Sequence, residues 1–532
     1  MQTGERTTGT GRPADGPAHE AGIARSLLRW LPLGLVLLVQ VVLSARLIGS
    51  TTAFIDEGTY IYAGHQEFDH LVHGESVATY ETFFSGVPVL YPVLVAMVDT
   101  VASLEGARLL SLAFMLSATV AVHLVTRRIH DGLAAFFASA LFVALGPTQF
   151  LGGFATYDAM ALALMAWAGW FAVRFAFGDG RRFLVLGAGL LVLANLTKYA
   201  SLLWNPVVVA LAVLAGPGYA AWRRARWRNG LLFTGAWALL AAGPALLAGE
   251  LYYRGFEKTT LLRKPAQDSY AYVAEEAAEW VGALVLLALA GVVVAFLASR
   301  GRGPAARVQA WLALVLLLGG IAAPVNQIRI HTWLSLQKHV DFGAWFACIV
   351  AGALLARTVA TVVRAELMPK AAVTALVGVL ALAPIGFVGA GQASFMMGAW
   401  PNSTPLIEAI RPYVHKGDDD YLIEDYNVAA YYFKDESNWQ QWHDLVVGTY
   451  TDPGTGQKLN GVPAFKAAIR DHKYRIIVLD FAQTRATDKA VEPAIQDAGY
   501  QLLVTIPTDN TATHGAYYVY LSPEAAQAGS RP

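Results

Sequence analysis

Long apolar segments recur along the chain, and they constrain its fold more than any other feature of the sequence. Most approach the ~20 residues that a helix needs to cross a bilayer. Hydrophobic residues make up 55% of the 532 and charged residues only 15%, whereas soluble proteins carry about 25% charged residues. The sequence therefore predicts a mainly α-helical, polytopic membrane protein. Its apolar segments lie at 27–48, 86–104, 107–126, 132–148, 158–176, 183–197, 199–215, 230–249, 279–298, 308–324, 339–356 and 371–391.

Composition along the chain indicates three regions. Residues 1–24 are rich in Gly, Thr and Pro without an apolar period, which predicts a disordered tail. Residues 25–391 hold the apolar segments and form the expected membrane domain. In residues 392–532, where 17 acids outnumber 11 bases, alternating strand-like and helical patterns predict a small α/β domain. Strands are expected at 421–424, 474–479, 500–504 and 517–521, and helices at 462–472 and 488–498.

Several classes of function are excluded by what the sequence lacks. The 39 bases balance the 39 acids, so no overall basicity indicates binding to nucleic acid. The single cysteine, Cys348, excludes a disulfide scaffold and any cysteine-based metal cluster. The sequence has no Gly-rich phosphate loop, which argues against an ATP-driven machine. The pairs His65/Asp69 and His70/His73 have partial metal-site spacing but share no helix face, so we expect no metal site there.

Basic residues give the expected orientation, because Lys and Arg are retained on the cytoplasmic side of a membrane. Alternate loops, which lie on the same side of the membrane, together hold 15 bases and three acids. Loop 49–106, on the other side, holds eight acids and no base. If segment 86–104 crossed the bilayer, Arg127–Arg128 and every later basic cluster would fall outside. We therefore expect 86–104 to lie at the outer face without crossing. This leaves about 11 crossings, a cytoplasmic N-terminus and an extracytoplasmic C-terminal domain.

A set of bases breaks this rule, because they are expected at the outer face. A base within the membrane costs at least ~2.5–3.5 kcal/mol unless it is paired or near water. Any one of them could be a side chain that snorkels at a helix end. Together they predict an anion site, for which a lipid phosphate is the obvious ligand. They are Arg108, Lys198, Arg254, Lys258, Arg263, Lys264, Arg329 and Lys338.

Acids on the same face are candidate proton acceptors. Asp56 and Glu57 follow the first apolar segment, and Asp158 opens a later one after Thr156-Tyr157. Two adjacent carboxylates cannot turn towards one point, so one can act as a base while the other orients it or binds an acceptor. The alternative is that these acids only stabilise helix N-termini through the macrodipole, with Thr156 as an N-cap.

In their order and sidedness these motifs resemble those of GT-C membrane glycosyltransferases that use polyprenyl-phosphate sugars. The most similar types are the aminoarabinose transferases of lipid A and the protein O-mannosyltransferases. The resemblance covers roughly residues 50–390. Its motifs are Asp56-Glu57-Gly58-Thr59-Tyr60, Pro88-Val89-Leu90-Tyr91-Pro92, Ala107-Arg108-Leu109, Asp158, and Leu196-Thr197-Lys198 followed by Pro206.

The sequence departs from both types of transferase. The aminoarabinose transferases carry a Lys before the proline segment, where this chain has Gly86-Val87. The protein mannosyltransferases continue Asp-Glu with Val and a nearby His, where this chain has Gly-Thr-Tyr. These departures leave the sugar and the acceptor open, but not the type of reaction.

The resemblance implies a transferase that moves a sugar from a polyprenyl-phosphate donor to a lipid, glycan or protein acceptor. Such transfer needs a base for the acceptor hydroxyl and cations for the departing phosphate. Asp56 is the expected base of an inverting single displacement, with Glu57 and Asp158 as further catalytic candidates. Tyr60 and Tyr91 are expected to contact sugar or acceptor, and no cofactor is required, although a divalent cation is compatible. The donor phosphate is expected at Arg108, Lys198, Arg254, Lys258, Lys338 and His339.

Other functions fit the same architecture. A ligase would move a glycan from a lipid diphosphate. A transporter of lipid or sugar would show paired hydrophobic repeats and broken midplane helices, and the sequence has no such repeat. A sugar-binding membrane protein without catalysis would tolerate loss of Asp56. Aromatic residues of the C-terminal domain could stack on sugars, but packing is the more expected role of Tyr431, Tyr432, Trp439 and Trp442.

Overall fold

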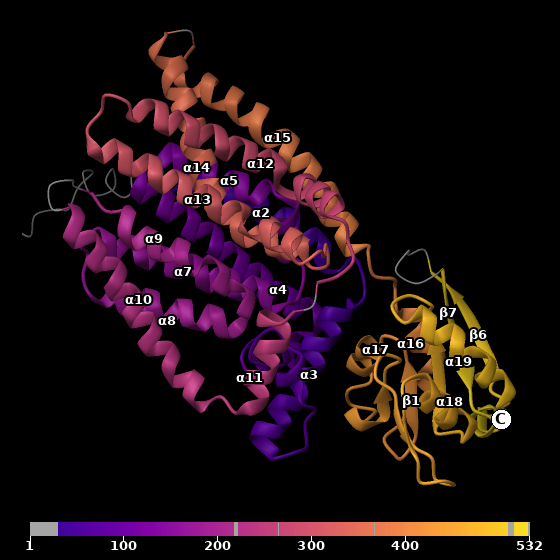
Figure 1. Ribbon diagram of the computed structural model, residues 1–532. Coiled ribbons are helices and arrows are strands. Elements are labelled where there is room, and N and C mark those ends of the chain that lie inside the picture. The colour runs from indigo at the N-terminus through magenta and orange to yellow at the C-terminus, as the bar shows by residue number, and fades with distance from the viewer. Residues whose placement is uncertain (1–29, 218–221, 264, 367, 509–514, 530–532) are drawn as a thin grey trace, which may run out of the picture.

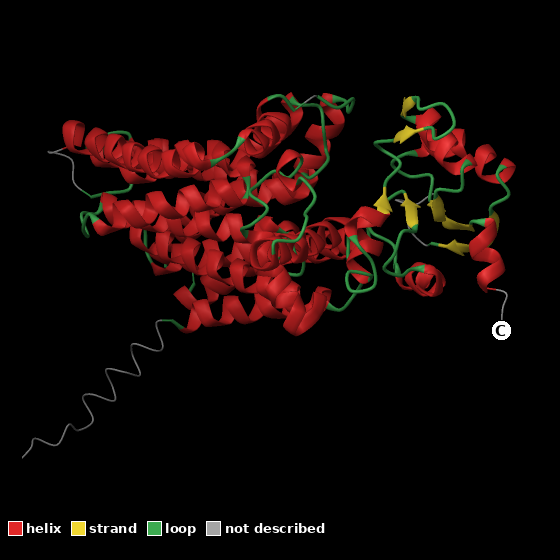
Figure 2. Ribbon diagram, turned by 90° about the horizontal axis from the view of Figure 1, so that it is seen from below, coloured by secondary structure: helices red, strands yellow, loops and turns green. Residues whose placement is uncertain are grey.

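Long helices lie side by side in a bundle, and a small domain with a sheet lies at one end of it, in this computed structural model (Figure 1). The structure describes residues 30–217, 222–263, 265–366, 368–508 and 515–529. The expected tail at 1–24 and the base Lys264 lie outside the described residues. Seen from below, the strands all belong to the smaller domain (Figure 2).

Short loops join the helices of the bundle, so successive helices are mostly neighbours. The longer helices are α2 (Leu31–Ile48), α3 (Ile55–His73), α4 (Tyr91–Ile129), α5 (Gly132–Ala144), α7 (Tyr157–Ala176), α8 (Arg182–Thr197), α9 (Asn205–Leu214), α10 (Trp222–Leu247), α12 (Tyr270–Ser299), α13 (Pro304–Arg329), α14 (Leu336–Arg364) and α15 (Lys370–Met397). The short elements are η1 (Tyr80–Thr82), α6 (Gly146–Leu151), η2 (Tyr199–Trp204), α11 (Glu250–Phe256) and η3 (Glu257–Leu261).

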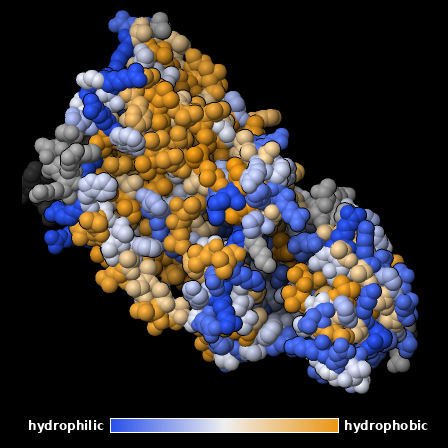
Figure 3. Space-filling model, in the orientation of Figure 1, coloured by the Kyte–Doolittle hydropathy of each residue, from blue (hydrophilic) through white to orange (hydrophobic). Residues whose placement is uncertain are grey.

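The bundle is a membrane domain. Eight of the described helices are long and apolar enough to cross a bilayer, and three shorter apolar stretches accompany them. Apolar side chains cover the flank of the bundle, whereas polar ones gather at its end and over the smaller domain (Figure 3). The prediction of a mainly α-helical, multi-pass membrane protein is confirmed, while the number of crossings stays a prediction.

Helix α4 is broken where the segment expected not to cross ends. Ala102 (φ −138°, ψ 17°) and Ser103 (φ 55°, ψ −165°) leave the helical region, and Ser103 adopts a left-handed φ that a residue with a side chain rarely takes. The half before the break packs closely on α3, because a Cβ on Gly64 would lie 1.9 Å from the Pro92 carbonyl oxygen. Residues 91–101 therefore form a helix distinct from the one that starts at Leu104.

The C-terminal domain is a small α/β unit, as expected. Its main sheet has the order β2-β1-β5-β7-β6, in which β2, β1 and β5 are parallel and β7 is antiparallel to both of its neighbours. The strands are β1 (Asp420–Ile423), β2 (Trp442–His443), β3 (Thr449–Thr451), β4 (Lys458–Asn460), β5 (Tyr474–Leu479), β6 (Gln501–Pro507) and β7 (Ala516–Leu521). The helices are α16 (Thr404–Ile410), α17 (Tyr426–Tyr432), α18 (Val462–Arg470), α19 (Arg485–Asp497) and α20 (Pro523–Gly529), with single turns η4 (Arg411–Tyr413) and η5 (Trp439–Gln441).

Helix α17 docks this domain onto the bundle. The Tyr431 hydroxyl donates to Asp99 Oδ1 at 2.7 Å, and the Tyr432 hydroxyl accepts from the Ala53 N–H at 2.9 Å. One hydrophobic core contains residues of both parts, so the two are packed as one body. These tyrosines, and Trp439 with its bond to the Ser76 carbonyl oxygen, serve packing rather than an open sugar site. The expected domain boundary at 391/392 falls inside α15.

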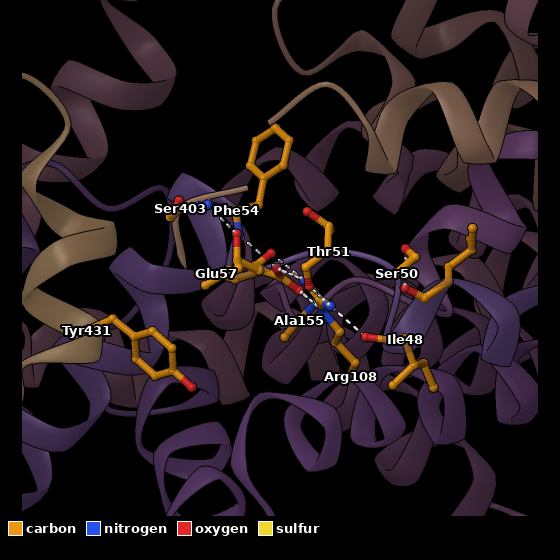
Figure 4. A network of polar contacts seen from close by, with 12 residues as sticks. Ile48, Ser50, Thr51, Phe54, Glu57, Arg108, Ala155, Ser403 and Tyr431 are labelled. Carbon is orange, nitrogen blue, oxygen red and sulfur yellow. Dashed lines mark hydrogen bonds and ion pairs between the residues drawn. The ribbon is translucent and has the colours of Figure 1, made fainter. Parts of the chain in front are cut away.

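A buried ion pair between Glu57 and Arg108 joins the end of α2 and the start of α3 to α4 (Figure 4). Arg108 donates to both carboxylate oxygens of Glu57, with N···O distances of 2.9 and 2.7 Å, and neither residue is exposed. Its remaining N–H groups bind the carbonyl oxygens of Ile48, Thr51 and Thr52, so all of its donors are used. Glu57 also accepts the N–H groups of Ala155 and Phe54, and the latter bond caps α3.

Removing one partner of this pair should destabilise the bundle strongly. Arg108→Leu leaves the Glu57 charge buried and unpaired, a change that typically costs about 3–5 kcal/mol of unfolding free energy. We expect a clearly lower unfolding temperature in detergent, measured by intrinsic fluorescence. Arg254→Leu is the matched control, because Arg254 forms an exposed pair with Glu250 that contributes about 1 kcal/mol or less. Equal unfolding temperatures for the two variants would contradict this role.

Candidate functional site

A cavity of about 340 Å³ lies where α3, α7 and α14 begin, at the end of the bundle near the C-terminal domain. Its walls include one carboxylate, several cations and a group of aromatic rings. Because three helix N-termini meet here, the backbone dipoles add to the positive potential. The lining residues are Asp56, Thr59, Tyr60, Phe83, Phe84, Ser85, Tyr157, Lys198, Lys258, Thr259, Arg263, Ser335, Lys338 and His339.

Asp56 and Lys338 face each other across this cavity. Asp56 lies in the first turn of α3 and Lys338 in the first turn of α14, and Lys338 Nζ donates to Asp56 Oδ2 at 2.5 Å. The Asp56 side chain is 31% exposed, which leaves it open to a ligand. Within the described residues no donor binds its other oxygen, Oδ1.

Lys198 forms an ion pair with the buried carboxylate of Asp158. Its Nζ donates to Asp158 Oδ1 at 2.5 Å and lies 4.7 Å from the centre of the Tyr157 ring. Asp158 is fully buried and does not line the cavity. Thr156 does not cap α7 with its side chain but donates to Asp158 Oδ2 at 3.2 Å. Asp158 therefore positions Lys198, and Thr156 positions Asp158.

Two further cations line the cavity without an acidic partner among the residues that the structure covers. Lys258 lies in η3, a π-helical turn, and Arg263 follows it. His339, next to Lys338, contacts the side chain of Gln327 through Nδ1 at 3.0 Å. With Lys198 balanced by Asp158 and Lys338 by Asp56, Lys258 and Arg263 make the site net positive.

A second cavity, of about 390 Å³, adjoins the first and is mostly apolar. The two share Ser85, Lys198, Thr259, Arg263 and His339. Beyond these residues its walls are mainly apolar and include Leu202, Leu203, Trp204, Phe256, Leu261, Ala323 and Ile330, while Asn326, Gln327 and Arg329 add a polar part. The shared cations therefore stand between a polar chamber and an apolar one.

Gly86 lies in a loop that leaves no room for a side chain. A Cβ at this position would lie 2.1 Å from the Thr197 carbonyl oxygen, because the loop runs against the end of α8. Two backbone bonds fix this contact, from Val87 N to the Leu196 carbonyl and from Tyr199 N to the Ser85 carbonyl, both 2.8 Å long. The close approach holds Ser85 and Lys198 in the same wall, and a lysine in place of Gly86 would not fit.

The structure brings together six of the expected site residues and separates five. Asp56, Tyr60, Lys198, Lys258, Lys338 and His339 line the cavity. Glu57, Arg108, Asp158, Tyr91 and Arg254 do not line it. Arg108 was expected at the phosphate, but all its donors are bound to Glu57 and backbone. Tyr91 is fully buried, and Arg254 forms an exposed ion pair with Glu250.

Other lining residues were not predicted as site residues. Thr59 belongs to the quoted motif that begins at Asp56, Tyr157 precedes Asp158, and Arg263 belongs to the set of bases expected at the outer face, so each had a signal in the sequence. Phe83, Phe84 and Ser335 had none, since they reach the cavity through loop geometry alone.

Two clusters outside this cavity contain residue types that can ligate a metal. His65 pairs with Asp99 and His73 with Asp69, so the histidine cluster is divided between separate partners. In the C-terminal domain, carboxylate oxygens of Glu424, Asp480 and Asp488 lie within 4.8 Å of one another. Burial and the adjoining Glu424 raise the pKa of Asp480 and of Asp488 above the usual range of a carboxyl group.

Comparison with known proteins gives matches in structure only. No family model matches the chain, and no curated protein sequence matches it. The chain is similar to ArnT from Cupriavidus metallidurans bound to undecaprenyl phosphate, with a TM-score of 0.59 and 14% identity over 91% of this chain and 97% of ArnT.

An archaeal protein gives a second match. The oligosaccharyltransferase AglB from Archaeoglobus fulgidus, in complex with an inhibitory peptide and a dolichol-phosphate, has a TM-score of 0.55. Its identity is 12%, over 93% of this chain and 74% of AglB. At such identities the likeness establishes the fold alone. The chain has the GT-C fold that these two proteins share.

Proposed function

We propose that this protein is a glycosyltransferase that moves a sugar from a polyprenyl-phosphate donor to an extracytoplasmic acceptor, by an inverting single displacement. The observation that carries the proposal is the cavity in which one open carboxylate, Asp56, faces a group of cations. The GT-C fold, shared with proteins bound to undecaprenyl phosphate and dolichol-phosphate, supports a donor of this class.

The two adjoining cavities fit the two parts of such a donor. The apolar cavity has room for the first isoprene units, and the polar chamber has room for the sugar. The phosphate then lies at the junction, where Lys198, Arg263 and His339 belong to both walls. Charge-assisted hydrogen bonds to phosphate are stronger than neutral ones, so this junction fixes the donor.

The chemistry then follows from the positions of the charges. Asp56 accepts the proton of the acceptor hydroxyl, whose oxygen attacks the anomeric carbon from the face opposite the phosphate. The bond from that carbon to the phosphate oxygen breaks, and polyprenyl phosphate leaves with the bonding electrons. Lys258 and Lys338 stabilise the charge that develops on the leaving phosphate. Lys338, through its bond to Asp56, also keeps the base directed into the chamber.

The proposed sidedness places the cavity and the C-terminal domain outside the cytoplasm. This sidedness rests on the 15 bases in the loops assigned to the cytoplasm and on the break that divides α4 after residue 101. In this arrangement residues 91–101 lie at the outer surface beside α3. The membrane domain then ends with α15, and the outer domain begins with α16.

A panel of donors tests the reaction class. The purified protein in detergent should consume at least one polyprenyl-monophosphate sugar and release polyprenyl phosphate, detected by mass spectrometry. Lipid-diphosphate glycans serve as the second arm. Consumption of only the diphosphate donors would identify a ligase, and consumption of neither, with intact folded protein, would contradict the transferase.

Asp56→Asn should abolish most of the turnover. The change keeps the size of the side chain but removes the proton acceptor, and general base catalysis typically contributes about 10²–10⁴-fold. We expect kcat to fall by about that factor while donor binding stays near normal, measured by steady-state kinetics and by titration with polyprenyl phosphate. Full activity of Asp56→Asn would remove Asp56 as the base.

Lys258→Ala should weaken use of the donor. A hydrogen bond to a charged group contributes ~1.5–3 kcal/mol, so the KM for the donor should rise about tenfold or more. Arg254→Ala is the matched control, because it removes a base one helical turn earlier that does not line the cavity. Similar donor KM values for the two variants would contradict the assignment of Lys258.

Reporter fusions test the sidedness. A fluorescent protein placed after Arg128, near the end of α4, should fluoresce in the cytoplasm, whereas alkaline phosphatase fused behind α20 should be active outside. We expect this because all the basic loops lie on one side of the membrane, and basic loops are retained in the cytoplasm. Alkaline phosphatase activity of a fusion after Arg128 would mean that residues 91–101 belong to an additional crossing.

A further inference from the structure

A groove of about 540 Å³ lies at the opposite end of the bundle from Asp56, between α12, α13 and α14. Its residues on α14 run from Val350 to Ala360, which is 12 to 22 residues beyond Lys338. At ~1.5 Å per residue this is about 18–33 Å from the Asp56 cavity along one helix. The groove is therefore separate from the proposed transferase site.

Small side chains create the groove. Eight of its 21 lining residues are alanine, while the flanking helices stay in close contact at its floor. There a Cβ on Gly291 of α12 would lie 2.9 Å from Val350 Cγ1 of α14. From Val350 to Ala360 the groove extends about 15 Å, which is half of the ~30 Å hydrocarbon thickness of a bilayer. Its length thus matches the acyl chains of one leaflet.

The mouth of the groove carries two arginines that form no ion pair with any described residue. Arg302 and Arg357 line it, and in the described part of the chain neither guanidinium has a hydrogen bond or an ion pair. One acid, Asp131, also lines the groove; its Oδ1 caps α5 by accepting the N–H groups of Leu133 and Ala134, and it forms no ion pair with either arginine among the described residues, so the two arginines leave the groove net positive. The cations at the mouth are thus left for a ligand.

A polar group stands between the mouth and the apolar floor. Gln309 lines the groove, and its Oε1 is buried without a donor among the described residues. A buried amide oxygen normally has a hydrogen-bond partner, so this one indicates a ligand with polar groups at that depth. From its mouth to its floor the groove is thus lined first by cations, then by a polar group and then by apolar side chains.

We propose that this groove binds an anionic phospholipid. Its phosphate lies at Arg302 and Arg357, its glycerol and ester groups lie near Gln309, and one acyl chain fills the alanine-lined part. Basic pockets between membrane helices bind anionic lipid headgroups, and each base near the surface adds to the attraction. The proposal does not depend on the transferase reaction, because the groove shares no residue with the Asp56 cavity.

Native mass spectrometry of the purified protein in detergent tests this site. Phosphatidylglycerol and phosphatidylcholine with identical acyl chains are titrated separately. We expect phosphatidylglycerol to bind about tenfold more tightly, because two unpaired arginines face its phosphate and no cationic choline opposes them. Equal binding of the two lipids would overturn the proposal.

Variants localise the binding. Arg302→Gln/Arg357→Gln should abolish the preference for phosphatidylglycerol, whereas Arg307→Gln, which removes an exposed base that does not line the groove, should retain it. Ala298→Phe, with the same unfolding temperature as the parent, should lower binding of the lipid by filling the channel. If Ala298→Phe fails to fold, Ala353→Phe replaces it. A retained preference in the double variant, or unchanged binding in a folded filled variant, would overturn the site.

Discussion

The buried pair of Glu57 and Arg108 is the interaction on which the rest of the site depends. Two charges leave water here, and their mutual attraction offsets that cost only because every donor of Arg108 has an acceptor. The pair joins the end of α2, the start of α3, the start of the second half of α4 and the residue before Thr156. Three regions that are distant in the sequence, residues 48–57, Arg108 and Ala155, are thereby held at fixed distances.

This arrangement also separates the roles of two adjacent acids. Neighbouring residues on a helix point about 100° apart, so turning Glu57 into the core turns Asp56 towards the cavity. The cations of the cavity also fall into two groups, those paired with an acid and those without an acidic partner among the described residues. Lys198 is neutralised by an acid behind it and is held in place, whereas Lys258 and Arg263 keep their charge for a ligand. A site built in this way is both ordered and attractive to anions.

Much of this organisation could be predicted from the sequence, and the remainder has definite physical reasons. The apolar segments identified the membrane domain, and charge parity singled out the segment that the break at Ala102 and Ser103 later divides from its neighbour. The sequence could not show that Arg108 forms a structural ion pair whereas Lys258 lines the cavity, because the partner of Arg108 is 51 residues away. Nor could it separate Arg254 from Lys258, because a π-helical turn starts between them. Eight alanines line the groove between α12, α13 and α14, and they form no motif in the sequence.

The docking of α17 has a consequence for how the protein is made. The turn around Asp56 leaves the ribosome well before the tyrosine that binds the Ala53 N–H, because that tyrosine follows 379 residues later. Membrane helices synthesised in between are inserted while that turn still lacks its final neighbour. The end of the bundle that holds the Asp56 cavity is completed only when the domain that carries α17 has folded, so a prematurely terminated chain carries the charges of the cavity without the contacts of Tyr431 and Tyr432.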